Sequence, residues 1–94
     1  MSGSLIDACL EGDLEAVKSL LKKPRIVNSI ATYENCALRC AASKGHLEIV
    51  KLLLTYPKVV EAIGAEDNMA LHWGIMYGYF EIVKALIDAY RSKL

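Results

Sequence analysis

The sequence has no excess of charge of either sign, because 11 Lys and Arg residues balance 11 Asp and Glu residues. A chain without net charge lacks the broad field with which proteins attract DNA, RNA or anionic lipid. Long hydrophobic runs are also missing, since no stretch approaches the roughly 20 apolar residues of a membrane-spanning helix. We therefore expect neither a nucleic-acid partner nor membrane association.

Cysteine is odd in number and occurs as Cys9, Cys36 and Cys40. An odd count without the spacing of a disulfide framework favours free thiols in a reducing, cytoplasmic compartment. Cys36 and Cys40 could share one face of a helix, but a structural zinc site usually takes four ligands. We therefore expect small buried apolar side chains, no metal and no cofactor.

Among the six glycines, Gly12, Gly45 and Gly78 are spaced at intervals of 33 residues. Each opens a similar phrase, which reads Gly-His-Leu-Glu-Ile-Val-Lys at residues 45–51. Self-similarity at a fixed period of a few tens of residues indicates stacked supersecondary units. The glycine spacing therefore predicts a repeat architecture.

Apolar residues recur after each glycine with the spacing of an amphipathic helix. The columns are Leu14, Leu47, Phe80; Val17, Val50, Val83; Leu20, Leu53, Leu86; and Leu21, Leu54, Ile87. A more apolar helix precedes each glycine, which ends it in a left-handed conformation. The helices after the glycines are predicted to end near Pro24 and Pro57, and the last to run from Glu81 to Leu94. Residues 25–35 and 58–68 are predicted to form extended returning loops, in which an asparagine can adopt a positive φ.

These units resemble the ankyrin repeat, which has 33 residues, two antiparallel helices and a Thr-Pro-Leu-His-x-Ala-Ala phrase. The phrase appears here as Cys-Ala-Leu-Arg-Cys-Ala-Ala at 36–42 and as Met-Ala-Leu-His-Trp-Gly-Ile at 69–75. The run Gly-His-Leu-Glu-Ile-Val-Lys-Leu-Leu-Leu at 45–54 is very close to the family consensus. The Thr-Pro pair is lost, and Pro24-Arg25 and Pro57-Lys58 replace the Gly-Ala that usually follows the second helix. The loops are therefore expected to be less regular than in the family.

The resemblance implies an all-α ankyrin-repeat solenoid of about three stacked helix-turn-helix units with connecting loops. We expect a single domain over residues 1–94, with units at about 4–31, 32–64 and 65–94. Three such units are about the minimum for a stable stack. We expect the chain to be a monomer.

The candidates for chemistry all have simpler structural interpretations. Glu15, Glu48 and Glu81 should form a ladder whose helices lie roughly 8–10 Å apart, which is too wide for a retaining pair of carboxylates. Each has a lysine three residues later and is expected to form a solvated ion pair. His46 and His72 occupy family positions with structural roles, and the cluster at 22–25 suits a helix C-terminus. We predict no catalytic residue and no enzymatic activity.

The resemblance implies a non-catalytic protein–protein interaction module that binds through its loop tips and concave helix surface. The expected partner-binding residues lie at the positions that vary within the family: Glu11, Thr32, Tyr33, Asn35, Ser43, Lys44, Glu66, Asn68, Met76 and Tyr77. Aromatic residues gather between Trp73 and Phe80, and Trp and Tyr are typical binding anchors. Met76 and Tyr77 suit partner contact and packing equally well, whereas Trp73 and Phe80 are expected to pack.

Two alternatives remain open at this point. The chain could be an ankyrin segment or scaffold of a longer protein, such as a host-directed effector with catalysis elsewhere. An exposed apolar end at Ile75, Ile82 and Leu86 would favour that reading. An enzyme in its own right would need a pocket with convergent titratable groups, and the sequence supplies no such pairing.

Overall fold

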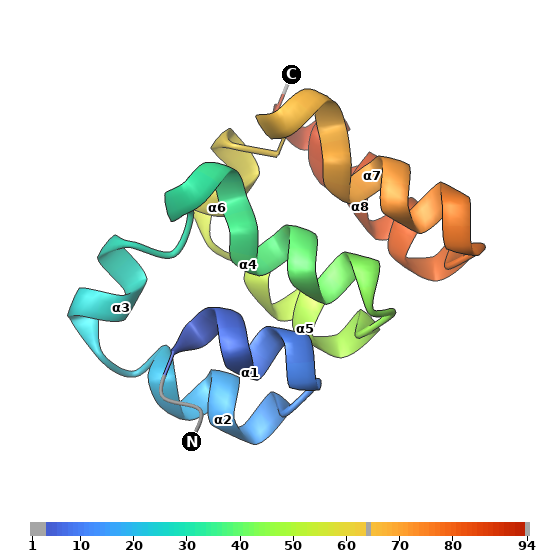
Figure 1. Ribbon diagram of the computed structural model, residues 1–94. Coiled ribbons are helices and arrows are strands. Elements are labelled where there is room, and N and C mark those ends of the chain that lie inside the picture. Colours follow the sequence, from blue (N-terminus) through green and yellow to red (C-terminus); the bar gives the residue numbers. More distant parts are fainter. Residues whose placement is uncertain (1–3, 64, 94) are drawn as a thin grey trace.

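The chain folds into helices joined by short turns in a computed structural model (Figure 1). The structure describes the backbone of residues 4–63 and 65–93, and the side chains in these ranges except those of 32–34, 65–69 and 93. Within these ranges the helices are α1 Leu5–Glu11, α2 Leu14–Leu20, α3 Pro24–Asn28, α4 Thr32–Ser43, α5 Leu47–Leu53, α6 Pro57–Glu61, α7 Ala65–Tyr77 and α8 Phe80–Lys93.

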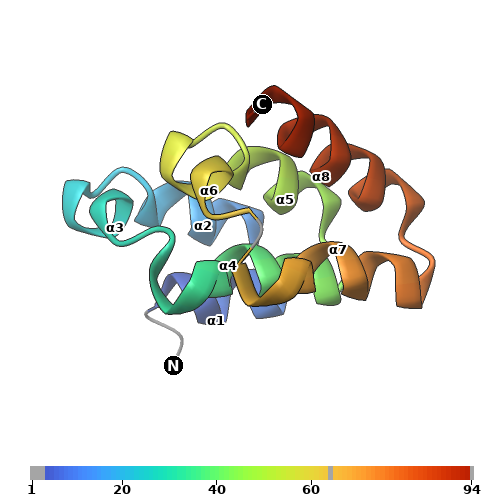
Figure 2. The ribbon, with the colours of Figure 1, turned by 90° about the horizontal axis from the view of Figure 1, so that it is seen from above.

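Three antiparallel helix pairs stack side by side in two layers. Helices α1, α4 and α7 form one layer and α2, α5 and α8 form the other, as Figure 2 shows. In the first layer α4 packs against both α1 and α7, and in the second α5 packs against α2 and α8. The buried core runs through the whole stack, with side chains such as Val17, Leu38 and Leu53 almost wholly enclosed. The predicted all-α solenoid is confirmed.

Each helix pair turns at one of the evenly spaced glycines. Gly12, Gly45 and Gly78 have φ values of 75°, 77° and 73°, the left-handed conformation predicted for them. The ring of the next unit lies over the first two of these turns. A Cβ on Gly12 would lie 2.5 Å from the His46 ring, and one on Gly45 would lie 2.9 Å from the Tyr79 ring. A Cβ on Gly78 would meet no atom within 4 Å.

Alanine substitutions at these turns are expected to destabilise the protein to different degrees. Gly78→Ala should lower the free energy of unfolding by about 1–2 kcal/mol, because a left-handed backbone strains any residue with a Cβ. Gly12→Ala should cost about 1 kcal/mol more, because the new methyl displaces His46, whose Nε2 donates to the Leu10 carbonyl oxygen at 3.1 Å. Urea unfolding of the two variants measures the difference. Equal losses would show that the histidine ring does not hold this turn.

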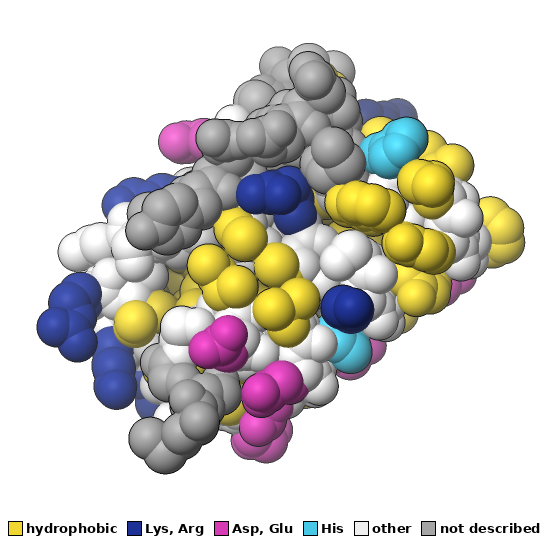
Figure 3. Space-filling view, viewed as in Figure 1, with side chains coloured by type: hydrophobic (Ala, Val, Ile, Leu, Met, Phe, Trp, Pro, Cys, Tyr) yellow, Lys and Arg dark blue, Asp and Glu magenta, His cyan; other side chains and the backbone are white. Residues whose placement is uncertain are grey.

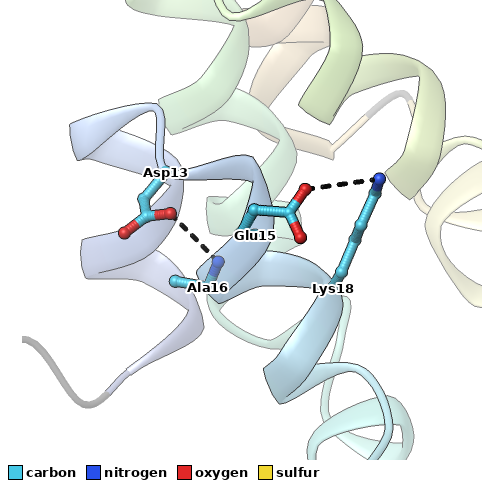
Figure 4. Close-up of polar contacts among 4 residues, drawn as sticks. All are labelled: Asp13, Glu15, Ala16 and Lys18. Atoms are coloured by element: carbon cyan, nitrogen blue, oxygen red, sulfur yellow. Dashed lines mark hydrogen bonds and ion pairs between the residues drawn. The ribbon is translucent and has the colours of Figure 1, made fainter.

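In the first unit, the position of His46 and Tyr79 is occupied by Asp13. Asp13 caps α2 instead, its Oδ1 accepting from the Ala16 backbone N–H at 3.0 Å (Figure 4). Beside it, Lys18 Nζ lies 3.6 Å from Glu15 Oε2. The predicted Glu–Lys pair is thus confirmed in this unit. The corresponding pairs of the other two units do not form within the described ranges, and exposed pairs of this kind contribute little stability.

Residues 25–35, 58–63 and 65–68 are not extended, so the sequence-based prediction of extended loops is wrong for them. Each of the first two segments begins with a short helix, α3 or α6, in which Pro24 or Pro57 occupies the first turn. Proline is favoured there because its fixed φ suits a helix and its missing N–H would have no intrahelical partner. Val59 of α6 is fully buried, so the short helix is also anchored by packing. Figure 1 shows α3 and α6 beside those ends of the helix pairs that lie opposite the glycine turns.

The helices that follow begin at Thr32 for α4 and Ala65 for α7, before the phrases at 36–42 and 69–75. Asn35, near the start of α4, has the expected positive φ, 63°. Its side chain is only 2% exposed, and its Nδ2 donates to the Val59 carbonyl oxygen at 2.9 Å. Asn35 therefore ties α4 to α6 across 24 residues of sequence.

Candidate partner-binding surface

The C-terminal ends of α1, α4 and α7 place two repeat positions side by side on the surface. The side chains at these positions define the α1–α4–α7 surface: Leu10, Glu11, Ser43, Lys44, Met76 and Tyr77. They are exposed or half-exposed in every unit. Because the positions are open in all three units, they do not serve packing between units and are free to contact another molecule.

The α7 part of this surface is apolar and aromatic. Met76 is 61% exposed and Tyr77 is 54% exposed. Tyr77 stacks on the half-buried Trp73, with ring centroids 5.6 Å apart and an interplanar angle of 7°. The ring centroids of Tyr77 and Tyr79 are 5.9 Å apart. The rings of His72 and Trp73 form a T-shaped pair with centroids 6.1 Å apart. These ring contacts limit the freedom of Tyr77 before a partner binds, which lowers the entropic cost of contact.

Charged and polar side chains separate this patch from a second apolar group. Figure 3 shows hydrophobic side chains gathered over α7 and, separately, over α1 and its junction with α4. Lys44 lies between the two groups in the repeat order, and Glu11 lies on the α1 side. A molecule lying across all three helices would therefore meet an acidic, a basic and an aromatic region in turn.

The three cysteines belong to α1 and α4, and only Cys9 is fully enclosed, whereas Cys36 and Cys40 are partly exposed. Cys9 is fully buried, and the Sγ atoms of Cys36 and Cys40 are 3.6 Å apart. Burial raises the pKa of the Cys9 thiol from 9.0 to about 12, with a smaller contribution from Cys40. Burial and the hydrogen bond to Cys36 raise the pKa of Cys40 to about 11. These two thiols stay protonated at neutral pH and are weak nucleophiles.

The raised thiol pKa values predict a loss of stability in alkali. Below pH 9 both the folded and the unfolded chain keep these protons, so the thiols confer no pH dependence there. Above the ordinary thiol pKa of 9.0, the unfolded chain releases protons that the folded chain retains. The free energy of unfolding should then fall by up to about 1.4 kcal/mol per pH unit for each thiol. Urea unfolding between pH 8 and 10 measures the slope, and Cys9→Ala should make it shallower. An unchanged slope in that variant would contradict the prediction.

The described side chains contain no group of three or more His, Cys, Asp or Glu residues placed to hold a metal ion. Among the helices described, none combines the length and the apolar character needed to cross a bilayer.

The three stacked pairs and their glycine turns agree with a comparison against protein-family models. The model for ankyrin repeats, in three copies, matches residues 5–93. The chain belongs to the ankyrin-repeat family. No curated protein and no solved structure matched it in the corresponding searches. Ankyrin repeats generally mediate protein–protein interactions and are typically not catalytic.

The structure brings together five of the ten residues expected to bind a partner of this ankyrin-repeat protein. These five are Glu11, Ser43, Lys44, Met76 and Tyr77. The side chains of Thr32, Tyr33, Glu66 and Asn68 lie outside the described residues. Asn35 departs from the expectation, because its buried amide bonds the backbone of α6 and is not available to a partner.

Two exposed apolar residues of the ankyrin stack were not expected from the sequence. Phe80 was predicted to pack, but it is 78% exposed, so that prediction is wrong. Leu10, which is also exposed, shares a repeat position with Ser43 and Met76. The variability of that position, already noted for the other two residues, is the signal that could have identified it.

Proposed function

We propose that this ankyrin-repeat protein is a non-catalytic module that binds a protein partner through the α1–α4–α7 surface. The observation that carries the proposal is the exposure of Met76 and Tyr77, each more than half open to solvent on a packed helix. Exposed apolar patches rimmed by polar residues are typical of interaction sites. The general role of the family supports the same function.

The order of side chains along the surface suggests the chemistry of the partner. A matching segment would place an apolar or aromatic anchor on Met76 and Tyr77 and an acidic group near Lys44. A basic group would face Glu11 in the first unit. Buried aromatic anchors usually supply most of the affinity of such an interface, whereas charges at its rim chiefly affect orientation and association rate.

Affinity enrichment with the 94-residue chain as bait tests the proposed surface. We expect the variant Met76→Ala/Tyr77→Ala to keep the helical circular dichroism of the parent. It should lose its captured partner, because the dissociation constant should rise at least tenfold. Ile87→Ala is the matched control, because Ile87 is an exposed apolar residue of the same unit but lies outside the surface. A folded double variant that still captures the partner with parental affinity would overturn the site.

We further propose a reducing, cytoplasmic location for the chain. Three free cysteines support it, since disulfides are rare in that compartment.

A further inference from the structure

Two of the three thiols lie in contact on α4. Cys36 and Cys40 are one helical turn apart, and their Sγ atoms are separated by 3.6 Å. Both side chains are partly exposed, whereas Cys9 is fully buried. The sequence-based expectation of buried thiols therefore holds for Cys9 alone. Two neighbouring thiols that solvent can reach are placed to react with each other.

The repeat register does not call for cysteine at either position. The equivalents in the first and third units are Gly3 and Met69 for Cys36, and Asp7 and Trp73 for Cys40. These residues differ widely in size and polarity, so the fold does not depend on a thiol at these places. The pair is therefore specific to the second unit and is free to serve a chemical role.

The helical backbone sets how closely the two sulfur atoms can approach. Residues four apart in an α-helix have Cα atoms about 6 Å apart, which lies within the range of about 4.4–6.8 Å found in disulfides. Their Cβ atoms are about 5–6 Å apart in a regular helix, whereas a disulfide brings them to about 3.5–4.5 Å. A bridge between Cys36 and Cys40 thus requires this turn of α4 to tighten.

The chain can make this adjustment just before Cys36. Asn35 has a φ of 63°, so the backbone already departs from regular helix at the residue next to Cys36. Cys40 is held more firmly, because its carbonyl oxygen accepts from Ser43 Oγ at 3.0 Å and from the Lys44 backbone N–H at 3.2 Å. We therefore expect Cys36 to move toward Cys40 and the resulting bridge to be strained. Strained or exposed disulfides are the labile, regulatory ones.

Positive side chains beside the pair favour an anionic oxidant. The charges of Arg39 and Lys44 oppose the rise in the pKa of Cys40 that burial and the hydrogen bond to Cys36 cause. Both cations therefore act on the site where the bridge would form. Glutathione disulfide is anionic at neutral pH because of its carboxylates, so these cations favour its approach. A transient bridge also suits a reducing compartment, where disulfides are usually catalytic or redox-sensing.

We propose that Cys36 and Cys40 form a reversible disulfide by exchange with glutathione disulfide. The Cys36 thiolate attacks one sulfur of glutathione disulfide, which forms a mixed disulfide and releases one glutathione thiolate. The Cys40 thiolate then attacks Cys36 Sγ, which forms the intrachain bond and releases the second glutathione. In all, the two protein thiols lose two electrons and two protons, and glutathione disulfide is reduced to two molecules of glutathione.

The second step suits Cys40 in spite of its raised pKa. A high pKa leaves little thiolate at neutral pH, which disfavours Cys40 as the first nucleophile. The second attack is intramolecular, however, and neighbouring groups react with a high effective concentration. The rate of closure should therefore rise with pH between 7 and 9, as the thiolate fraction of Cys40 grows.

Tryptic mapping after incubation of the 94-residue chain in glutathione disulfide tests the bridge. The remaining thiols are first blocked with N-ethylmaleimide in denaturant. Trypsin cleaves after Arg39, between the two cysteines, so a bridge joins the peptides 26–39 and 40–44. We expect this linked pair in the parent chain and its loss after excess reduced glutathione is added. The intact chain should have the mass of a monomer less two hydrogen atoms, and Cys9, in peptide 1–18, should stay reduced.

Single variants assign the two steps. Cys40→Ala should stop at the mixed disulfide and keep one glutathione on Cys36, and Cys36→Ala should form no bridge. Cys9→Ala is the matched control and should form the bridge like the parent. Circular dichroism checks that each variant is folded, and the mapping of the parent chain stands without them.

Three results would overturn the proposal. A parent chain whose thiols all stay reduced would show that the pair does not exchange with glutathione disulfide. A parent chain that stops at the mixed disulfide would show that α4 does not tighten enough to close the bridge. Linkage of peptide 1–18 to either of the others, or a covalent dimer, would show that a different pair of thiols reacts. Partner capture by folded Cys36→Ala reports separately on the proposed function, which the bridge does not require.

Discussion

Replacing Ile82 with alanine is expected to lower the free energy of unfolding by about 2–5 kcal/mol. Ile82 is almost completely buried in α8, where it packs in the layer next to α5. Truncation removes buried methyl groups and leaves a cavity that the surrounding helices fill only in part. Domains of this size are stable by only about 5–15 kcal/mol in total, so the variant should unfold at a much lower urea concentration.

Ile75→Ala supplies the matched control for this prediction. It removes the same atoms from the same unit, but Ile75 is largely exposed. Its effect should stay within about 0.5 kcal/mol, as is usual for surface substitutions, when measured at low protein concentration. Equal losses in the two variants would show that the burial pattern of the third unit is wrong.

Asn35→Ala is expected to lower the free energy of unfolding by about 2–4 kcal/mol. Asparagine tolerates positive φ better than alanine does, and the strain of alanine in that region is about 1–2 kcal/mol. The change also removes the Nδ2 donor of the Val59 carbonyl oxygen. A buried carbonyl left without its partner costs about 1–3 kcal/mol.

Asn35→Gly separates the two causes, because glycine accepts the positive φ but lacks the amide. It should recover the strain and retain the loss due to the hydrogen bond. Chemical denaturation of both variants gives the difference. If glycine were as destabilising as alanine, the backbone conformation of Asn35 would have no energetic weight. If Asn35→Gly restored parental stability, the hydrogen bond from Asn35 to α6 would contribute nothing to stability.

The regular part of the fold could be predicted because it depends on local pattern. Gly12, Gly45 and Gly78 marked the turns, and the apolar columns between them placed the two layers. A period shared by three units strengthens each local signal, since an accidental pattern would not recur at 33 residues. The same register also distinguishes positions that pack between units from those that remain exposed.

The connecting segments were predicted less well because several conformations suit the same residues. Pro24 and Pro57 disfavour continuing one helix but also favour starting another, and the sequence does not decide between these effects. Packing decides, since the apolar residues after each proline reach the core. Asn35 illustrates the same limit, because its buried bond depends on a carbonyl 24 residues away.

The sequence predicted which residues form the candidate site but not how far their side chains are exposed. The varying residues of the first layer, such as Lys44 and Tyr77, could be read from the repeat register. Whether Phe80 packs or faces solvent depends on contacts between units, which the local pattern does not contain. That is a property of the assembled stack, which explains why Phe80 was assigned to packing.

The rings that lie over the glycine turns impose an order on the units. His46 covers Gly12 and Tyr79 covers Gly45, so each unit supplies the cover for the one before it. An engineered duplicate of the middle unit, inserted after the original, would bring a histidine to cover Gly45 and a new glycine for Tyr79 to cover. A duplicate of the first unit in that place would bring Asp13 instead. The stack can therefore be lengthened from its middle, but its first unit is specific to the place it occupies.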